Sequence, residues 1–473
     1  MLSLLTDLLW SKVLIAVLIG IGIWFTVATR FVQFRYFGNM FKILTAKHHE
    51  ADGKHLSSFQ ALILSVAGRV GGGNIAGVAV AITLGGPGAI FWMWVVGLMG
   101  MATSFVECLL AQTYKTAEND GTYRGGPAYY IERGLGKKWK WLAIIYSVLL
   151  LATFGIAFTT LQSYSVATSL EDAFGIQPYY SGIAMAFVVG LIIFGGVKRI
   201  AQVAEVLVPI MAGGYLLIAL IVIAMNLSLI PETLMLIIKS AFGLEPAIGG
   251  GIGAAILMGV KRGLFSNEAG LGSAPNVAAV AYIPHPANQG IVQAFSVFID
   301  TIVLCTCTAL IILLGTAYDP TSTDTVQGVA LTQASLATHM GDYGRMFVSI
   351  ALLLFGFSTV LYNYYLGENS VSYLTKSDNH GFYMNSFRVI IICLCCTGAI
   401  LDLGTVFAFA DLTMGLLALA NLVALALLFK VAKRIMKDFD GQRQSGKETP
   451  TFEAARFDDL DLDTTSWPNK DNH

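Results

Sequence analysis

Residues 69–77 of the chain, RVGGGNIAG, place an arginine, three consecutive glycines and an asparagine inside an otherwise apolar stretch. Each glycine costs a helix about 1 kcal/mol relative to alanine, so the run predicts that a helix unwinds there. Backbone groups freed at the depth of a bilayer survive only where they are buried in protein or line a wet cavity. Such a break can bind a carboxylate at the start of its second half and a small cation at the carbonyls that end its first half.

A pair of hydroxyl side chains could serve the same cation. Ser358 and Thr359 are adjacent in the apolar segment FGFSTVLY, residues 355–362. Two hydroxyls and a few backbone carbonyls supply the hard oxygen ligands that sodium prefers, without a fixed charge. The alternative is that both hydroxyls only bond back to the preceding helical turn.

A second segment, RGLFSNEAG at residues 262–270, matches the first at a constant offset. The matching pairs are Arg69 with Arg262, Asn74 with Asn267, Ala76 with Ala269, and Gly77 with Gly270. Arginine and asparagine are rare in membrane spans, so the match indicates an internal repeat led by a broken helix in each half. Chance similarity, or glycines that only allow close helix packing, are the alternatives.

Composition decides which elements must position these groups. Of the 473 residues, 55% are hydrophobic and only 12% are charged, against about 25% charged in soluble domains, which indicates a polytopic membrane protein in a lipid bilayer. A net charge of -1 provides no basic surface for nucleic acid. Metalloprotease, hydrolase, nucleotide-binding and dinucleotide-binding motifs are absent from the sequence, which argues against a membrane-embedded enzyme.

The chain is predicted to be all-α, with a transmembrane helix wherever about 20 apolar residues run together. Eleven such runs lie near residues 3–29, 58–84, 88–114, 141–172, 179–197, 203–226, 246–283, 291–316, 344–374, 385–400 and 404–430. Lys and Arg cluster in the loops that follow the first, third, fifth, ninth and eleventh runs, which places those loops in the cytoplasm, the N-terminus outside and the C-terminus inside.

This orientation sends the two broken segments through the membrane in opposite directions. We therefore predict an extra N-terminal span followed by a five-plus-five inverted repeat. The boundaries are 1–57 for the extra span and its cytoplasmic loop, 58–226 and 246–431 for the repeats, and 432–473 for a disordered cytoplasmic tail. His285, between two prolines in a cytoplasmic turn, is expected at the surface.

Charges inside the spans are expected to pair across helices, because an unpaired charge at the bilayer centre costs at least about 2.5–3.5 kcal/mol. For Arg69 we favour a structural clamp on the break, neutralised by Glu107 or Glu368, over a direct role in binding. The other charges inside or at the edges of spans are Lys261, Arg262, Glu268, Asp300 and Asp411.

Several motifs in order closely resemble the alanine or glycine:cation symporter family: FVQFRYF, GGGNIAGVA, TSFVECLLAQTY, RGGPAYYI and FSNEAGLGSAP. The resemblance runs from about residue 10 to 430. It implies sodium-coupled uptake of a small neutral amino acid. It also implies the five-plus-five fold of the leucine transporter, preceded by one extra span, in the cytoplasmic membrane of a prokaryote and working as a monomer.

The resemblance also implies a substrate site and an ion site. The substrate site would use amides near Gly72, Gly73 and Asn74 for the carboxylate, with Gln162, Ser266 and Asn267 taking the amino group or closing the pocket. The sodium site would combine carbonyls of Ala67, Val70 and Phe355 with the hydroxyls of Ser358 and Thr359.

Two positions depart from the family pattern. Many members have threonine where this chain has Gly72, and tryptophan where it has Asn363. Both changes remove volume near the expected pocket, so serine or glutamine is expected as a possible substrate besides alanine and glycine. The alternative functions are an amino-acid-conducting channel and, less favoured, a membrane enzyme.

Overall fold

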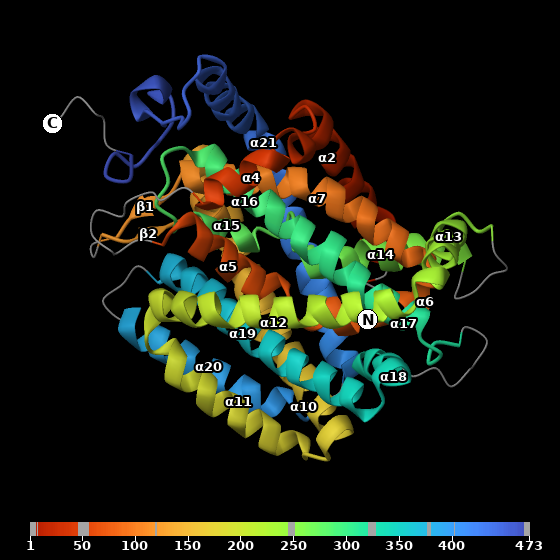
Figure 1. Cartoon of the computed structure of the whole chain (residues 1–473). Helices are drawn as coiled ribbons and strands as arrows, with labels where there is room; N and C mark the ends of the chain where they lie inside the picture. The colour runs from red at the N-terminus through yellow and green to blue at the C-terminus, as the bar shows by residue number, and fades with distance from the viewer. Residues whose placement is uncertain are drawn as a thin grey trace.

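The computed structural model describes residues 6, 8–45, 56–118, 121–244, 251–319, 328–375, 380–401 and 403–467. Within them the chain is a bundle of helices with one two-stranded hairpin, as the all-α prediction required (Figure 1). The α-helices are α2 (Ile15–Ala28), α3 (Val32–Arg35), α4 (Phe37–Thr45), α5 (Ser58–Arg69), α6 (Val78–Gly85), α7 (Gly88–Thr113), α8 (Pro127–Gly134), α9 (Lys140–Leu150), α10 (Thr159–Phe174), α11 (Pro178–Ile193), α12 (Gly196–Met225), α13 (Ile230–Ala241), α14 (Gly251–Asn267), α15 (Ser273–Ala278), α16 (Pro286–Val297), α17 (Thr306–Leu314), α18 (Val329–Met340), α19 (Asp342–Leu374), α20 (His380–Gly398) and α21 (Leu403–Gln444).

Short irregular elements join or interrupt these helices. Strands β1 (Thr116–Ala117) and β2 (Tyr123–Arg124) pair antiparallel. Short 3₁₀ turns lie at Lys137–Trp139, Leu227–Leu229 and Ala454–Phe457. Wider π-helical turns occupy Leu9–Leu14, Gly73–Gly77, Leu151–Phe158 and Phe298–Cys305. Such turns often mark functional positions in helices, and two of these four lie beside the predicted site.

Among the described residues, eight helices are long and apolar enough to cross a membrane, and α5 with α6 makes a ninth span bent by 51°. Two more of the predicted runs correspond to shorter helices, α11 and α14. The protein therefore spans a membrane many times, while the count of eleven stays a prediction.

Helix α5 begins where the sequence supplies a cap. Ser57 accepts a hydrogen bond from the N–H of Gln60, and the Gln60 side chain accepts one from the N–H of Ser57, which completes a capping box. The helix ends after Arg69, because Val70 is extended with φ -80° and ψ 92°. We call residues 70–72 the first break. It lies at the glycine run, as predicted.

A second interruption separates α14 from α15. Glu268, Gly270 and Gly272 all have positive φ, at 55°, 91° and 79°. Glycine adopts this left-handed region without strain, whereas a glutamate there is uncommon. We call residues 268–272 the second break. Close by, the backbone N–H of Tyr282 donates to the carbonyl of Leu56. The chain just after α15 therefore lies beside the chain just before α5.

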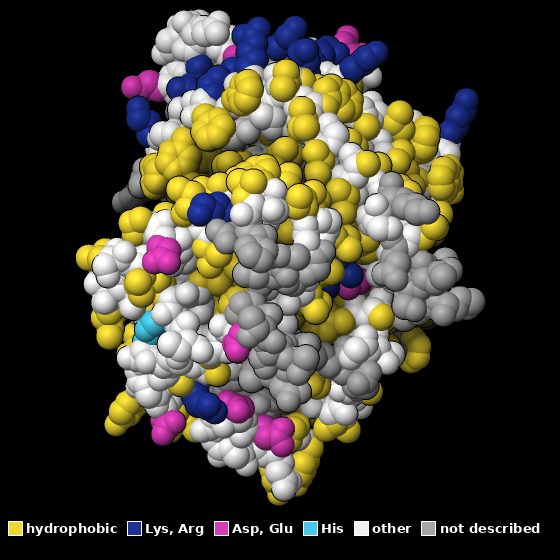
Figure 2. All heavy atoms as spheres, turned by 90° about the vertical axis from the view of Figure 1, so that its right-hand side faces the viewer, with side chains coloured by type: hydrophobic (Ala, Val, Ile, Leu, Met, Phe, Trp, Pro, Cys, Tyr) yellow, Lys and Arg dark blue, Asp and Glu magenta, His cyan; other side chains and the backbone are white. Residues whose placement is uncertain are grey.

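The surface agrees with a membrane setting. Figure 2 shows hydrophobic side chains over the middle of one face and Lys and Arg gathered at its upper end. Large apolar side chains are exposed along two outer helices, α11 and α12, including Phe187, Leu191, Val206 and Ile210. A water-exposed apolar surface of this extent would be costly, so these helices face lipid.

The C-terminal segment differs from the disordered tail predicted at 432–473. Helix α21 continues to Gln444, and residues up to 467 pack against the end of the bundle where α7 finishes (Figure 1). Phe452 and Trp467 are buried, with ring centroids 4.9 Å apart. The Trp467 Nε1–H donates to the carbonyl of Gln112 at 3.2 Å. The backbone N–H of Phe452 donates to the carbonyl of Pro284 at 2.8 Å. Aromatic anchors thus order a segment that its polar composition marks as disordered.

His285 is also buried, not at the surface as predicted. Its ring lies 5.0 Å from the centroid of Phe439 and 5.7 Å from that of Phe452, and its Nε2 is 3.3 Å from a carboxylate oxygen of Asp438. The C-terminal segment covers the turn that carries it. Burial lowers the pKa of His285, while Asp438 acts in the opposite direction.

Candidate functional site

All five residues predicted to hold sodium meet at the first break. The Ser358 hydroxyl on α19 donates to the carbonyls of Ala67 at 3.2 Å and Phe355 at 3.0 Å. The Thr359 hydroxyl reaches the carbonyls of Ala67 at 3.0 Å and Val70 at 3.5 Å. One member of the group was missed from the sequence, because Thr359 also lies 3.3 Å from the carbonyl of Gly68. The result is a buried cluster of oxygen atoms with no charged side chain among them.

The glycine run brings its backbone against neighbouring side chains. The N–H of Gly72 donates to Oε1 of Gln162 on α10 at 3.0 Å, and the N–H of Gly71 donates to Oδ1 of Asn74 at 2.9 Å. A Cβ at Gly71 would lie 2.6 Å from the Thr359 hydroxyl oxygen, and one at Gly73 would lie 3.0 Å from the ring of Phe265. Glycine is therefore required at Gly71 and Gly73, because neighbouring side chains lie too close to the backbone for a larger residue. The Gln162 side chain hydrogen-bonds directly to the freed backbone of the first break.

Asn74 and Ser266 are brought together across the two broken helices. The Asn74 amide donates to Ser266 Oγ at 3.1 Å and to Asp300 Oδ1 at 2.6 Å. Ser266 in turn donates to Asp300 Oδ2 at 2.7 Å. From the sequence, Asp300 is expected only as one of the charges within spans. Its position in the middle of an apolar run could have predicted a role at the site, because an acid at that depth is costly unless it is functional.

The hydrogen bonds of Arg69 do not go to the acids predicted to neutralise it, although Arg69 acts electrostatically on Glu107. Its guanidinium donates to the carbonyl of Gln293 at 3.2 Å and to Ser104 Oγ at 3.1 Å, and it also contacts Ser296 Oγ. Within the described ranges it forms no ion pair with Glu107 or Glu368. Glu368 lies 3.5 Å from Arg124 instead. The clamp on α5 is thus built from neutral acceptors on α7 and α16, which lie within hydrogen-bonding reach of the guanidinium.

Glu107 belongs to the second break. Its carboxylate accepts from the N–H of Gly270 at 3.2 Å and from the amide of Asn421 at 3.1 Å, while that amide also donates to the carbonyl of Gly270. Tyr146 donates to the carbonyls of Leu271 and Gly272. Asn267, predicted for the substrate site, caps its own turn by accepting from the N–H of Ala269 at 2.9 Å.

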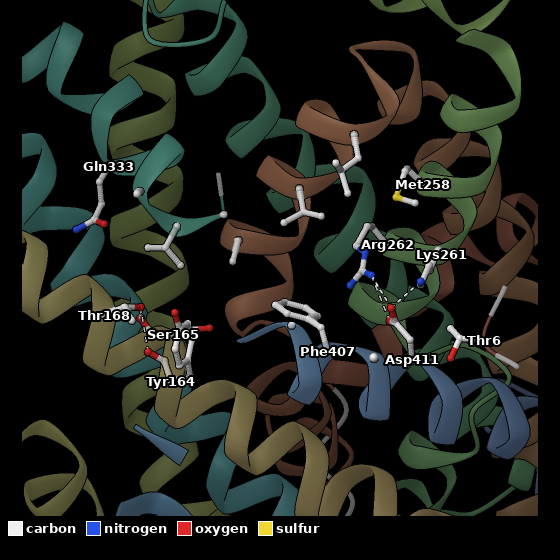
Figure 3. Close-up of a pocket in the computed structure, with 18 of the residues that line it drawn as sticks. Thr6, Tyr164, Ser165, Thr168, Met258, Lys261, Arg262, Gln333, Phe407 and Asp411 are labelled. Atoms are coloured by element: carbon white, nitrogen blue, oxygen red, sulfur yellow. Dashed lines mark hydrogen bonds and ion pairs between the residues drawn. The ribbon is translucent and has the colours of Figure 1, made fainter. Parts of the chain in front are cut away.

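A cavity of about 520 Å³ lies beside the first break (Figure 3). Ser165 and Ala76 line it near the glycine run, and Phe407 and Gln333 face it from α21 and α18. At one side Lys261 and Arg262 both pair with Asp411, at 2.5 Å and 3.0 Å. None of the predicted substrate residues lines this cavity. Ser165 nevertheless lies 3.6 Å from where a Cβ of Gly72 would stand.

Asn363 is fully buried on α19, one helical turn beyond Thr359. Neither its amide nitrogen nor its amide oxygen has a hydrogen-bond partner in the part of the chain that the structure describes. A buried amide without partners costs about 1–3 kcal/mol for each unsatisfied group. The Asn363 amide therefore has hydrogen-bonding capacity that a polar group of a ligand could use.

Comparison with known proteins gives one consistent result. Residues 1–454 match the family described as Sodium:alanine symporter family. The "Probable sodium/glutamine symporter GlnT" of Bacillus subtilis is 46% identical over 94% of this chain and 91% of its own length. The amino-acid carrier protein AlsT of the same organism is 44% identical, covering 96% and 95%. The sodium/alanine symporter AgcS of Methanococcus maripaludis is 38% identical, covering 92% and 96%.

Among solved structures, the Eremococcus coleocola manganese transporter, crystallised with an aromatic bis-isothiourea compound, is similar in fold. The TM-score is 0.52 at 15% identity, and the match covers 87% of this chain and 85% of that one. At this identity the likeness concerns the fold alone.

Proposed function

Because the chain belongs to the sodium:alanine symporter family, and is therefore an amino-acid:sodium symporter and not an enzyme, we propose that it imports a small neutral amino acid by alternating access. Alanine and glycine are the expected substrates, with serine or glutamine also accepted. The name of the relative GlnT, which includes glutamine, supports the wider range. The ion that drives import is sodium.

The observation that carries the proposal is the oxygen cluster at the first break. Two hydroxyls of α19 lie 3.0–3.5 Å from carbonyls of Ala67 and Val70. The hydroxyls now donate their protons to these carbonyls. With a sodium ion between the oxygens, the hydroxyls would keep their protons, turn them away and present their lone pairs to the ion. The carbonyl of Phe355 would complete the set. Because α5 ends at these carbonyls, an ion there also benefits from the negative end of the helix dipole.

The substrate carboxylate is proposed to bind next to this ion, at the amides that start the second half of the broken helix around Gly72, Gly73 and Asn74. Positive helix ends and a nearby sodium both favour an anion there. Gln162 accepts a hydrogen bond from the N–H of Gly72. We propose that it releases this group or remains as a lid when the amino acid enters from the cavity beside Ser165.

The orientation is proposed from charge. Lys and Arg gather at one end of the molecule in Figure 2, and the ordered C-terminal segment packs at the end where α7 finishes, near Gln112. By the positive-inside rule this end is cytoplasmic, which puts the N-terminus outside. The Lys261, Arg262 and Asp411 cluster would then lie on the outer side of the breaks. We expect the protein to act as a monomer.

The test is uptake of labelled alanine into proteoliposomes with and without an inward sodium gradient. Replacing Ser358 and Thr359 together by alanine removes two oxygen ligands, so half-maximal sodium should rise at least about tenfold or uptake should vanish. Ser349→Ala is the matched control, because Ser349 lies on the same helix and donates to the carbonyl of Ser169. An unchanged sodium dependence in a folded double variant would reject the ion site.

The same vesicles distinguish a symporter from a channel. A symporter should accumulate alanine above the outside concentration and saturate, whereas a channel should only equilibrate it. Serine and glutamine added as competitors define the substrate range.

A further inference from the structure

Asp300 lies at the centre of a span and between the two broken helices. It belongs to the span Pro286–Leu314, within the π-helical turn Phe298–Cys305, and its side chain is fully buried. Three neutral groups donate to its carboxylate: Asn74 at 2.6 Å, Ser266 at 2.7 Å and Thr301 at 2.8 Å. The side chain is thus held by both broken helices at once.

No positive group pairs with Asp300 in the described part of the chain. This contrasts with Asp411, which has both Lys261 and Arg262. The charged or titratable groups that face Asp300 are Arg69, Glu268 and Cys305. The guanidinium of Arg69 makes its hydrogen bonds elsewhere, and it also acts electrostatically on Glu268 and Glu107.

The buried charges around the breaks therefore do not balance. One guanidinium faces three carboxyl groups, those of Glu107, Glu268 and Asp300. Ionised together they would leave two uncompensated negative charges, and each costs at least about 2.5–3.5 kcal/mol at the bilayer centre. Glu107 accepts hydrogen bonds from the N–H of Gly270 and from Asn421 on α21. Glu268 accepts from Ser273 on α15 and Tyr362 on α19. Asp300 is the carboxyl group that touches Asn74, a predicted substrate residue.

The neighbours of Asp300 favour a proton over a metal ion. The Asn74 side chain presents its N–H group to Asp300, because its carbonyl oxygen is already occupied by the N–H of Gly71. A metal ion beside this carboxylate would face an amide hydrogen instead of an oxygen. Protonation needs only that a hydroxyl such as that of Ser266 turns to accept.

We propose that Asp300 is a proton-binding site whose occupancy is linked to binding of the substrate carboxylate. This rests on the proposed function, which places that carboxylate at Gly72–Asn74. An ionised Asp300 in contact with Asn74 would repel the carboxylate group of the zwitterionic amino acid, so a carboxylate bound at Gly72–Asn74 favours the protonated acid. By reciprocity, protonation tightens substrate binding by the same factor.

The first experiment uses the wild-type protein and alanine at saturating sodium. Calorimetry in buffers of different ionisation enthalpy counts the protons taken up on binding. We expect uptake approaching one proton, and an alanine affinity that weakens by up to about tenfold per pH unit once Asp300 is ionised in the free protein. Zero uptake at every pH between 5 and 9 would overturn the proposal. Sodium-dependent alanine binding without proton uptake rejects only this inference, whereas no sodium-dependent binding rejects the proposed function.

The second experiment assigns the proton. Asp300→Asn keeps the shape and cannot ionise, so proton uptake should disappear and affinity should no longer depend on pH. The control Glu205→Gln changes another acid within a span, which pairs with Gln60 on α5, and should keep the proton uptake. Unchanged uptake in Asp300→Asn would overturn the assignment.

A third variant decides the matter even if Asp300→Asn does not fold. Thr301→Val is isosteric and removes one donor to the ionised carboxylate. The pH at which alanine affinity begins to fall should therefore move upward. An unmoved profile would mean that another group titrates.

Discussion

The two breaks differ in what holds their freed backbone groups. At the first break, neutral side chains from distant helices do so: Gln162, Ser358 and Thr359. At the second, a carboxylate, an asparagine and a tyrosine are fixed around residues 270–272. The first is held by groups that an ion or a carboxylate can replace. The second is closed by Glu107 and its partners. A small ligand that displaced them would leave the Glu107 carboxyl group buried without hydrogen bonds.

This difference teaches that similar sequence breaks need not share a role. Glu268, Gly270 and Gly272 at the second break have positive φ angles, while Val70 at the first is in the ordinary extended region. From these partners we propose that ligands bind at the first break, and that the segment before the second break positions Asn74 through Ser266.

The largest expected effect comes from closing the first break. Gly73→Val would bring bulk within about 3 Å of the Phe265 ring, where even a Cβ already lies at 3.0 Å, and alanine binding should fall below detection. Gly77→Ala is the control, because its Cβ would meet the same ring at an ordinary 3.7 Å. Binding is measured by calorimetry. Normal alanine affinity in folded Gly73→Val would mean that the first break, like the second, serves helix packing and does not bind the substrate.

A large effect of another kind is expected at the second break. Glu107→Ala leaves the N–H of Gly270 and one N–H of the Asn421 amide without an acceptor, at about 1–3 kcal/mol each. The midpoint of thermal unfolding in detergent should fall, while half-maximal sodium in the folded fraction stays unchanged. Glu107→Gln retains one acceptor oxygen and should lose less. A sodium dependence that shifts with Glu107→Ala would remove the distinction between the breaks.

A selectivity change is expected from Asn363, whose amide has no partner among the described residues. Asn363→Trp should reduce competition by serine and glutamine against labelled alanine several-fold, because it fills space and removes the amide. Asn363→Leu separates the two causes, since it removes the amide at similar size. If serine and glutamine fail to compete in the wild type and the profile does not change in Asn363→Trp, the side-chain pocket lies elsewhere.

The smallest effect concerns the chain beyond the second break, where residues 451–467 cover the turn at His285. Burial lowers the pKa of Lys115 to about 7, while Asp463 acts in the opposite direction. Its amino group lies 4.0 Å from the ring centroid of Tyr123 and 4.4 Å from that of Trp467. A released segment would restore the ordinary value near 10.5.

Between those two values the docked form binds fewer protons than the released form, so docking should strengthen as pH rises above about 7. Hydrogen exchange of residues 451–467 should therefore slow by up to several-fold from pH 7 to pH 8.5, after correction for intrinsic rates. Lys115→Met should remove this dependence. Protection that decreases with pH would contradict the prediction.

The sequence predicted the features that local chemistry decides. The glycine run gives the first break because glycine weakens a helix wherever it stands, and the apolar runs give the spans because the bilayer requires them. That Ser358 meets Ala67, a residue 291 positions away, came from the family resemblance and not from any local pattern.

Contacts that join three distant segments were not predictable. Glu107 hydrogen-bonds to Gly270 and Asn421 and interacts with Arg69 only electrostatically, so the direct pairing expected for Arg69 is not found among the described residues. The C-terminal segment is ordered by three aromatic residues spread over sixteen positions, Phe452, Phe457 and Trp467, which form no periodic pattern. His285 is buried only because that segment covers it.

The π-helical turn at Phe298–Cys305 also limits how the gene can change. A π-turn rotates less per residue than an α-helix, so residues five apart lie on one face there, whereas in a regular α-helix they would point about 140° apart. Asp300 and Cys305 are five residues apart and both reach Ser266, so their shared direction depends on this turn. Insertion of a further residue between them should therefore be eliminated by selection even where point substitutions on the lipid side of the span are accepted.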